Sequence, residues 1–426
     1  MRDLLGFKYS VCCSMTLVVL SFSPALVEAE SIAGARIPLG YSLKQAVFGG
    51  EGKDPGNLFI HEDKRPMFQT VIKIPDWVPV EKRTHLEAQY YMYTTWHSHH
   101  NEVYLSWTRS LENMTPKSWM DVEKPVLSFS KNSDSSRDWK HVGGLEIYLD
   151  HEHQLFLGAI HGSSGKSTVY GAAHLNFMGT SPYGLNFNDP ETGGGVKGAR
   201  FDGEAWGPIE HPGYGVDIDA TAVFAHDYAR FFKRAGRLYC MGKGGRIHRA
   251  PLDDPKTACY EPYVARGKEG ADQWKKWWKG DNERILTLFT GSDEFKNHPN
   301  NPHPGDIPGV TCKGWENHVD VLELVDGIYE IFFYIKILDK SKFRGIYRVV
   351  LDARNDDWSQ WEFMRDKQGE VIFNTVLPYG SRYLVGDLAG DPFIYEENGR
   401  KLMSYSYSPG REGKISCVEL VPTGFL

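Results

Sequence analysis

Cysteine is scarce in this 426-residue chain, with six residues in all. Two of them, Cys12 and Cys13, lie in the apolar stretch near the N-terminus. The others are Cys240, Cys259, Cys312 and Cys417. So few cysteines exclude a disulfide scaffold. A single bridge between Cys240 and Cys259 stays open, and so does a role for one cysteine as a metal ligand.

Long hydrophobic runs are also missing beyond the N-terminus. Arg2 and Lys8 precede the apolar stretch Val11 to Phe22, which has the length of a signal peptide and is too short to span a bilayer. A small-residue cleavage site follows at 27–29. We therefore expect 1–29 to be a signal peptide and 30–426 to form one secreted or periplasmic domain, free of the membrane. An uncleaved anchor is the alternative.

A strong excess of one charge is absent too. The net charge of −7 is modest for a chain with 48 basic and 55 acidic residues, and it suggests no nucleic-acid partner. The local balance differs, because residues 230–249 hold seven basic residues and no acidic one. We expect this segment to help attract an anionic substrate.

Long amphipathic helices are not apparent, and one short helix is expected at 268–279. The chain instead repeats hairpin-like units of strand, polar turn and aromatic-rich strand, in keeping with 13% aromatic residues and 44 glycines. The expected turns are Asp150 to His153, Ala235-Gly236, Asp326-Gly327 and Asn398-Gly399. Such units predict an all-β protein, a β-propeller of at least five blades. A two-sheet sandwich is the alternative, and 162–215 is expected to be a long loop near the active face.

Two histidines flank one of these hairpins. His141 and His161 lie twenty residues apart with one turn between them, so antiparallel pairing would bring both to the same rim. Two imidazoles at one rim could act together on a substrate. A pair of hydrogen-bonded structural histidines fits the same spacing.

Tyr214 and Arg230 form a second candidate pair. Tyr214 stands between two glycines, which favours an exposed phenol. Arg230 opens an otherwise apolar strand, where an arginine needs a carboxylate partner from the protein or from a ligand. An internal ion pair, for example with Asp227, is the alternative for Arg230, and aromatic packing is the alternative for Tyr214.

A third set has the composition of a tetrahedral zinc site. Its members are His248, His298, His303, Cys312 and His318. Their spacing matches no zinc finger, so a loop of surface histidines beside a buried cysteine is the alternative. The cluster of His97, His99 and His100 fits a rim contact with substrate, or plain exposure, better than a metal.

These motifs together resemble the propeller-type ulvan lyases of marine bacteria. The resemblance lies in the hairpin ending at His161-Gly162, in Arg230 sixteen residues after Tyr214, and in the spacing of Cys312 and His318. It implies a seven-bladed propeller, within an expected range of five to seven, that cleaves a sulfated uronate polysaccharide. It also implies a structural Zn²⁺ held best by His248, Cys312 and His318, with His298 or His303 as fourth ligand.

Uronate elimination would give each candidate a role. Arg230 would neutralise the substrate carboxylate, while His141, His161 and Tyr214 would share the base and acid roles. The expected enzyme is therefore a monomeric lyase acting on an anionic algal polysaccharide.

Two other classes stay open. A propeller glycoside hydrolase needs two carboxylates beside the scissile bond. The candidates are Glu146, Asp150, Asp227 and Asp391. A carbohydrate-binding propeller without catalysis would need only Arg230 and the aromatic side chains.

Overall fold

The structure is a computed structural model of the chain. It describes residues 36–48, 55–58, 66–96, 99–122, 125–128, 139–151, 154–168, 171–187, 230–234, 237–242, 246–249, 284–287, 316–335, 345–355, 361–378, 380–383, 388–408 and 413–426. The chain divides into a unit at 1–37 and a unit at 38–426, and everything below concerns the second. The expected signal peptide at 1–29 and short helix at 268–279 lie outside the described residues and stay predictions.

The described strands form five antiparallel sheets. The first contains β2 (Pro66–Lys73), β3 (Tyr90–Trp96), β4 (His99–Thr108) and β5 (Met120–Asp121), with β6 (Leu127–Ser128) also pairing with β4. The second contains β7 (Trp139–Asp150), β8 (Leu155–Thr168) and β9 (Gly171–Ser181). The third contains β10 (Arg230–Arg234), β11 (Arg237–Gly242), β12 (Arg246–Arg249) and β13 (Arg284–Thr287).

The last two sheets follow the same plan of neighbouring strands in chain order. The fourth contains β14 (Glu316–Val325), β15 (Ile328–Ile335), β16 (Gly345–Asp352) and β17 (Glu362–Phe363), with β18 (Phe373–Pro378) also pairing with β16. The fifth contains β19 (Leu388–Glu397), β20 (Arg400–Ser408), β21 (Lys414–Phe425) and β1 (Pro38–Gln45).

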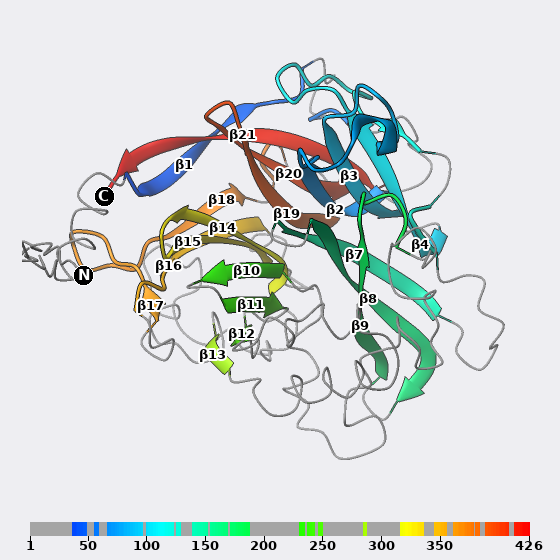
Figure 1. Cartoon of the computed structure of the whole chain (residues 1–426). Coiled ribbons are helices and arrows are strands. Elements are labelled where there is room, and N and C mark those ends of the chain that lie inside the picture. The colour runs from blue at the N-terminus through cyan, green and yellow to red at the C-terminus, as the bar shows by residue number, and fades with distance from the viewer. Residues whose placement is uncertain are drawn as a thin grey trace, which may run out of the picture. The chain divides into compact units, whose positions relative to one another are not determined.

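The first strands of the five sheets contact one another in a ring. β2 contacts β7, β7 contacts β10, β10 contacts β14, β14 contacts β19, and β19 returns to β2. The fifth sheet is completed by β1, which pairs with β21 although the two come from opposite ends of the chain (Figure 1). A ring of meander sheets closed in this way is a β-propeller, as the sequence predicted. The resemblance implied seven blades, whereas the described residues form five sheets, the lower end of the expected range.

The hairpin turns predicted from the sequence are confirmed. Asp326-Gly327 and Asn398-Gly399 each join two strands directly, since Val325 pairs with Ile328 and Glu397 pairs with Arg400. Asn398 and Gly399 both have positive φ, 50° and 72°, which is the backbone of the tight turn that suits the twist of a hairpin. Asp150 pairs with Leu155 and Arg234 pairs with Arg237, so the strands on either side of the other two predicted turns also pair as expected.

The expectation of a long loop at 162–215 is wrong in its first part. β8 continues to Thr168, and β9 at Gly171–Ser181 pairs with it across almost its whole length. Glycine and serine lower the strand propensity of 162–174, but backbone pairing within the sheet overrides this local preference. Residues 188–215 lie outside the described part of the chain.

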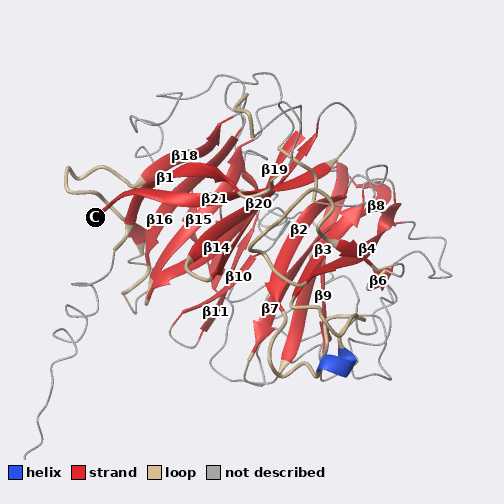
Figure 2. Cartoon of the chain, turned by 90° about the horizontal axis from the view of Figure 1, so that it is seen from above, coloured by secondary structure: helices blue, strands red, loops and turns tan. Residues whose placement is uncertain are grey.

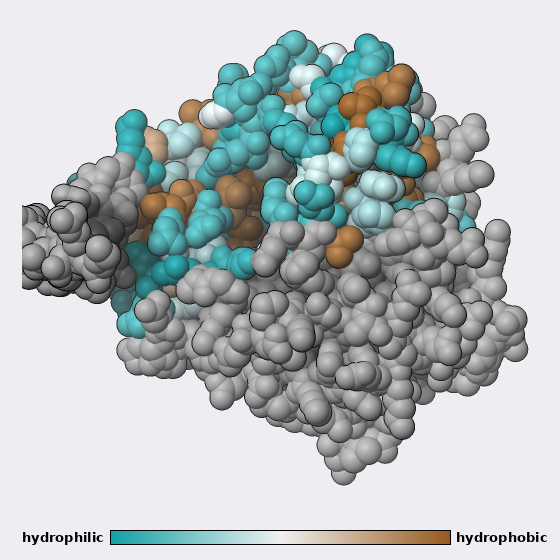
Figure 3. Space-filling view, viewed as in Figure 1, coloured by the Kyte–Doolittle hydropathy of each residue, from teal (hydrophilic) through white to brown (hydrophobic). Residues whose placement is uncertain are grey.

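The hydrophobic core is divided into layers between neighbouring sheets. One cluster packs Phe232 of β10 against residues of β15 and β16, another packs Val71 and Met92 of the first sheet against the fifth, and a third joins the fourth and fifth sheets. Phe333, Tyr347 and Phe373 stack within the fourth sheet. The described surface in Figure 3 is mainly hydrophilic, with scattered hydrophobic side chains. Sheet-on-sheet packing of this kind stabilises the ring and leaves its first strands around a common centre.

Helix contributes little to the part of the chain that the structure describes. Its single helical turn is η2 (Val80–Lys82), seen in blue in Figure 2. None of the helical segments in the described residues is long and apolar enough to span a membrane.

Candidate active site at the centre of the ring

The two predicted histidines lie on adjacent strands. His141 of β7 pairs with Ser163, and His161 of β8 pairs with Gly143, so the two positions are diagonal neighbours across the ladder. They are set inside the sheet, because β8 runs on to Thr168. Tyr214 lies outside the described residues. The roles given to His141, His161 and Tyr214 therefore stay predictions.

The predicted zinc ligands are also largely untested. His248 lies in β12, His318 in β14, and the backbone of each is described. His298, His303 and Cys312 lie outside the described residues, as do His97 and Cys259. Among the described residues no group of three or more metal-ligating side chains comes together. Zinc binding by this set stays a prediction.

A different set of polar side chains meets at the ring of first strands. Thr70 of β2, Glu146 of β7, Arg230 of β10 and Asp320 of β14 are all buried, at 0%, 6%, 5% and 5% exposure. One guanidinium Nη atom of Arg230 pairs with Glu146, and its Nε atom lies 3.8 Å from Asp320. Four of the five sheets thus each supply one member, and the guanidinium also lies 5.4 Å from the Phe393 ring of β19. We call Thr70, Glu146, Arg230 and Asp320 the central cluster.

Irregular strands place these side chains at the centre. A register shift interrupts the ladder of β7 between Gly143 and Glu146, where Gly144 has a φ of 57°. A similar shift in β2 lies just before Thr70, with Phe68 at a φ of 56°. A bulge turns the following side chain relative to the regular pleat. The two shifts occur just before the positions that enter the central cluster.

The charges of the central cluster do not balance when both acids are ionised, because it has one cation and two carboxylates. Burial raises the pKa of Glu146 to about 8; Arg230 opposes this shift and Asp320 adds to it. Burial also raises the pKa of Asp320 to about 6, against Arg230 and the backbone N–H groups of Ile394 and Val321. Both pKa values are raised beside a single cation, which favours one proton shared by the two acids.

The hydrogen bonds favour the proton on Glu146 and the charge on Asp320. Asp320 accepts from the backbone N–H of Val321 at 2.9 Å and from that of Ile394, and donors of this kind favour a charged carboxylate. Both donors to Glu146, the hydroxyl of Thr70 at 3.4 Å and the guanidinium of Arg230, reach its Oε2 atom. Within the described residues no donor reaches Oε1, which leaves that oxygen to carry the proton.

The sequence had pointed to only part of this cluster. Glu146 was a candidate under the hydrolase alternative, and Arg230 was a candidate under the lyase interpretation. The alternative of an internal ion pair for Arg230 is the one observed, with Glu146 and Asp320 as partners. Asp320 and Thr70 were missed, although an aspartate inside the apolar strand Val319 to Val325 was a usable signal. Asp150 lies at the far end of β7, while Asp391 is bonded to Phe68 and Ser406 instead.

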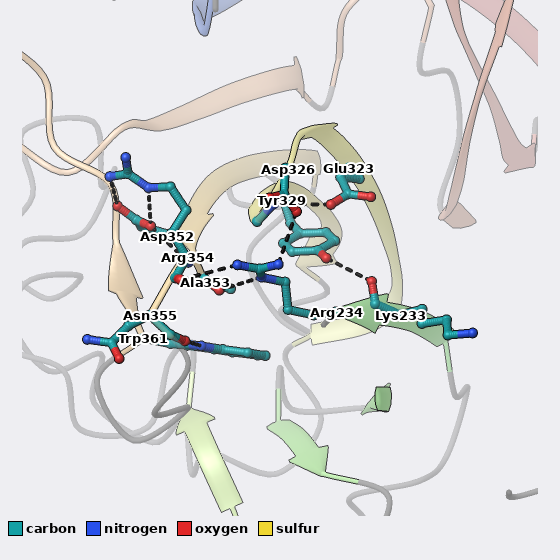
Figure 4. A network of polar contacts seen from close by, with 11 residues as sticks. Lys233, Arg234, Glu323, Asp326, Tyr329, Asp352, Ala353, Arg354, Asn355 and Trp361 are labelled. Carbon is teal, nitrogen blue, oxygen red and sulfur yellow. Dashed lines mark hydrogen bonds and ion pairs between the residues drawn. The ribbon is translucent and has the colours of Figure 1, made fainter. Parts of the chain in front are cut away.

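Part of the basic run serves contacts between sheets. Arg234 donates to the carbonyl oxygens of Ala353 and Arg354 at 2.8 and 3.1 Å and pairs with Asp326 at 3.0 Å (Figure 4). Tyr329 donates to the carbonyl of Lys233 at 2.9 Å in the same network. Arg230 and Arg234 therefore bind protein groups, and of the basic side chains that the structure describes in this run only Lys233 is exposed.

Comparisons with known proteins show similarity of fold only. No family model and no curated protein matches the chain. Solved structures that match include a thermostable family-43 glycoside hydrolase (12% identity, 84% of this chain and 93% of that one, TM-score 0.46). Another is an α-L-arabinofuranosidase from Lactobacillus brevis (13% identity, 83% of this chain and 90% of that one, TM-score 0.47). A third is an α-L-arabinanase from Cellvibrio cellulosa in complex with arabinohexaose (11% identity, 83% of this chain and 91% of that one, TM-score 0.43).

The expected ulvan lyase activity is wrong. It required Arg230 to neutralise a substrate carboxylate, and the structure buries Arg230 against Glu146 and Asp320 instead. The chain is a β-propeller whose ring of first strands encloses a buried pair of carboxylates around one arginine.

Proposed function

We propose that this protein is a glycoside hydrolase that acts on a polysaccharide, with Glu146 and Asp320 as its two carboxylates. The observation that carries the proposal is their meeting, from different sheets, on one arginine at the ring of first strands. Glycoside hydrolysis needs one carboxyl group that is protonated and one that is ionised. The raised pKa values of both acids, and the backbone donors that favour the charged form of Asp320, support that combination.

Each residue then has a distinct role. Glu146 donates the proton of its Oε1 atom to the leaving glycosidic oxygen, because burial keeps it protonated at a pH where most glutamates are charged. Asp320 stays ionised and stabilises the positive charge that develops on the sugar ring. It also takes a proton from the water molecule whose oxygen bonds to the anomeric carbon as the glycosidic bond breaks. Arg230 bridges the two acids and opposes the pKa rise of each, which prevents both from being protonated together.

The test is release of reducing ends by the full chain from a panel of polysaccharides. The panel includes neutral arabinan, xylan and galactan, together with ulvan as an anionic member. We expect Glu146→Gln and Asp320→Asn each to lower turnover by about 10²- to 10⁴-fold, the range for loss of a general acid or base. Glu362→Gln is the matched control, since Glu362 is exposed on β17 away from the ring and should keep full activity.

Two outcomes would overturn the proposal. Equal activity of wild type and Glu146→Gln would remove Glu146 from the chemistry. Binding of a polysaccharide without release of reducing ends would instead make the protein a carbohydrate-binding propeller. Products with an ultraviolet-absorbing unsaturated end would contradict hydrolysis directly.

A further inference from the structure

We infer that Thr70 is a positioning residue that orients the Glu146 carboxyl group, and that a buried lock between β2 and β19 holds Thr70 in place. The inference rests on the proposed function for its kinetic consequences, and its structural part stands by itself. It concerns Gln69, Asp391 and Ser406, which we call the lock. All three are buried, at 0%, 1% and 1% exposure.

The hydroxyl of Thr70 fixes which oxygen of Glu146 carries the proton. Thr70 donates to Oε2, the same atom that Arg230 contacts. With two donors on Oε2, a proton on that atom would oppose both, so the proton resides on Oε1. Arg230 is shared with Asp320, whereas the hydroxyl of Thr70 has no other recorded partner in the described residues. Thr70 is thus the contact specific to the glutamate.

The lock ties the two residues before Thr70 to the neighbouring sheet. The backbone N–H of Phe68 donates to Asp391 Oδ2 at 3.2 Å, and the side-chain amide of Gln69 donates to the carbonyl oxygen of Asp391. The hydroxyl of Ser406 on β20 lies 2.7 Å from Asp391 Oδ2 and 2.9 Å from Gln69 Oε1. Two consecutive residues of β2 are therefore held against β19.

Backbone strain shows that the lock has a structural task. Phe68 and Asp391 have φ values of 56° and 53°, in the left-handed region that non-glycine residues rarely adopt. Such conformations persist when surrounding contacts enforce them, and they cluster at functional sites. The enforcing contact is the bond between these same two residues. The side chain of Thr70 emerges directly after this strained pair.

The lock also explains why Asp391 is not part of the central cluster. Its Oδ2 atom accepts from Phe68 and Ser406, and its carbonyl accepts from Gln69. The charged and titratable groups recorded around Glu146 are Arg230 and Asp320 alone among the described residues. Asp391 therefore reaches Glu146 through β2.

The experiment compares Thr70→Val with Thr70→Ser in the full chain. Valine keeps the shape and removes the donor, so kcat should fall about 10- to 100-fold through loss of orientation. Because the hydrogen bond favours the charged carboxylate, its loss should also move the alkaline limb of the pH–rate profile to higher pH. Serine keeps a hydroxyl and should restore both. A kcat loss with an unmoved limb, or no rescue by serine, would overturn the role of Thr70.

Infrared spectroscopy provides a readout that does not need activity. The carboxyl C=O band of Glu146 is assigned by its disappearance in Glu146→Gln, and it should move to higher frequency in Thr70→Val, because Oε2 loses a donor. A shifted band in a protein without hydrolase activity would contradict the proposed function and support the role of Thr70. An unshifted band in an active hydrolase would support the proposed function and contradict the role of Thr70.

The lock is tested by Ser406→Ala against a matched serine. Ser406→Ala should move the band and the pH limb in the same direction as Thr70→Val, by a smaller amount, because Gln69 and Phe68 still bind Asp391. Ser416→Ala is the control, since Ser416 is equally buried on β21 and donates to the carbonyl of Pro55 at 3.1 Å. Identical spectra for the two alanine variants would exclude the lock.

Discussion

Two buried charge clusters in this propeller differ in how completely they are paired. The central cluster has one cation for two carboxylates. A second cluster lies where the closing strand β1 meets the fourth and fifth sheets, and it consists of Tyr41, Glu330, Arg348 and Lys401. We call it the closure cluster. Arg348 pairs with Glu330. Lys401 pairs with Glu330 and with the exposed Glu396, so the charges of the cluster balance once Glu396 is counted.

Hydrogen bonding separates the two clusters further. Arg348 donates to Glu330 at 2.6 Å, to Asn374 at 2.9 Å and to the carbonyl of Pro38 at 2.8 Å. In the central cluster the Nε atom of Arg230 is buried without a hydrogen-bond partner among the described residues. A fully satisfied network stabilises one conformation, whereas an unbalanced one leaves a proton that can move. Burial is therefore common to the two clusters, and charge balance separates them.

The largest expected difference concerns stability after loss of one carboxylate. Glu330→Gln leaves Arg348 and Lys401 buried without their shared carboxylate and should lower the free energy of unfolding by about 3–5 kcal/mol. Glu146→Gln leaves one cation with one carboxylate, so at pH 5, before the raised pKa of Glu146 costs much stability, its effect should stay within about 1 kcal/mol. Guanidinium chloride unfolding measures both. Equal losses in the two variants would remove the distinction between the clusters.

The next difference concerns the pH dependence of stability. The pKa of Glu146 is raised from 4.5 to about 8 in the folded protein, so folding is helped by proton binding below 4.5 and this contribution is lost as the pH rises through 8. The free energy of unfolding of wild type should therefore fall relative to Glu146→Gln between these values. Denaturant titrations of both proteins at pH 5, 6, 7 and 8 measure the difference. A wild-type free energy of unfolding that rises with pH relative to that of Glu146→Gln would contradict a raised pKa.

Local sequence signals predicted much of the fold. Asn398-Gly399 and Asp326-Gly327 set hairpins by their own backbone preferences, so those turns were readable without tertiary structure. The pairing of β1 with β21 was not predicted, because it joins Pro38 to Phe425 across almost the whole chain. The strand β9 was missed for a related reason: its start, Gly171-Ala172-Ala173, has low strand propensity and takes its conformation from pairing with β8.

The central cluster was only partly predictable for a similar reason. Arg230 in an apolar strand signalled a buried partner, and that signal was sound. The identity of the partners depends on the ring, which brings β7 and β14 to β10 from positions 84 and 90 residues away along the chain. The resemblance to lyases gave Arg230 a substrate carboxylate as partner, and the ring supplies Glu146 and Asp320 instead.

The smallest expected difference compares single hydroxyl groups in the two clusters. Tyr41 donates to Glu330 at 2.5 Å and accepts from Lys401 at 2.9 Å, so Tyr41→Phe should cost about 1–3 kcal/mol by leaving charged groups underbonded. Thr70 makes one longer bond of 3.4 Å to a glutamate that is protonated near neutral pH, so Thr70→Val should cost less than about 1 kcal/mol while altering the pH–rate profile. Unfolding free energies and pH–rate profiles of both variants separate the cases. A profile shift in Tyr41→Phe, or a larger stability loss in Thr70→Val, would mean that charge balance does not divide the two clusters.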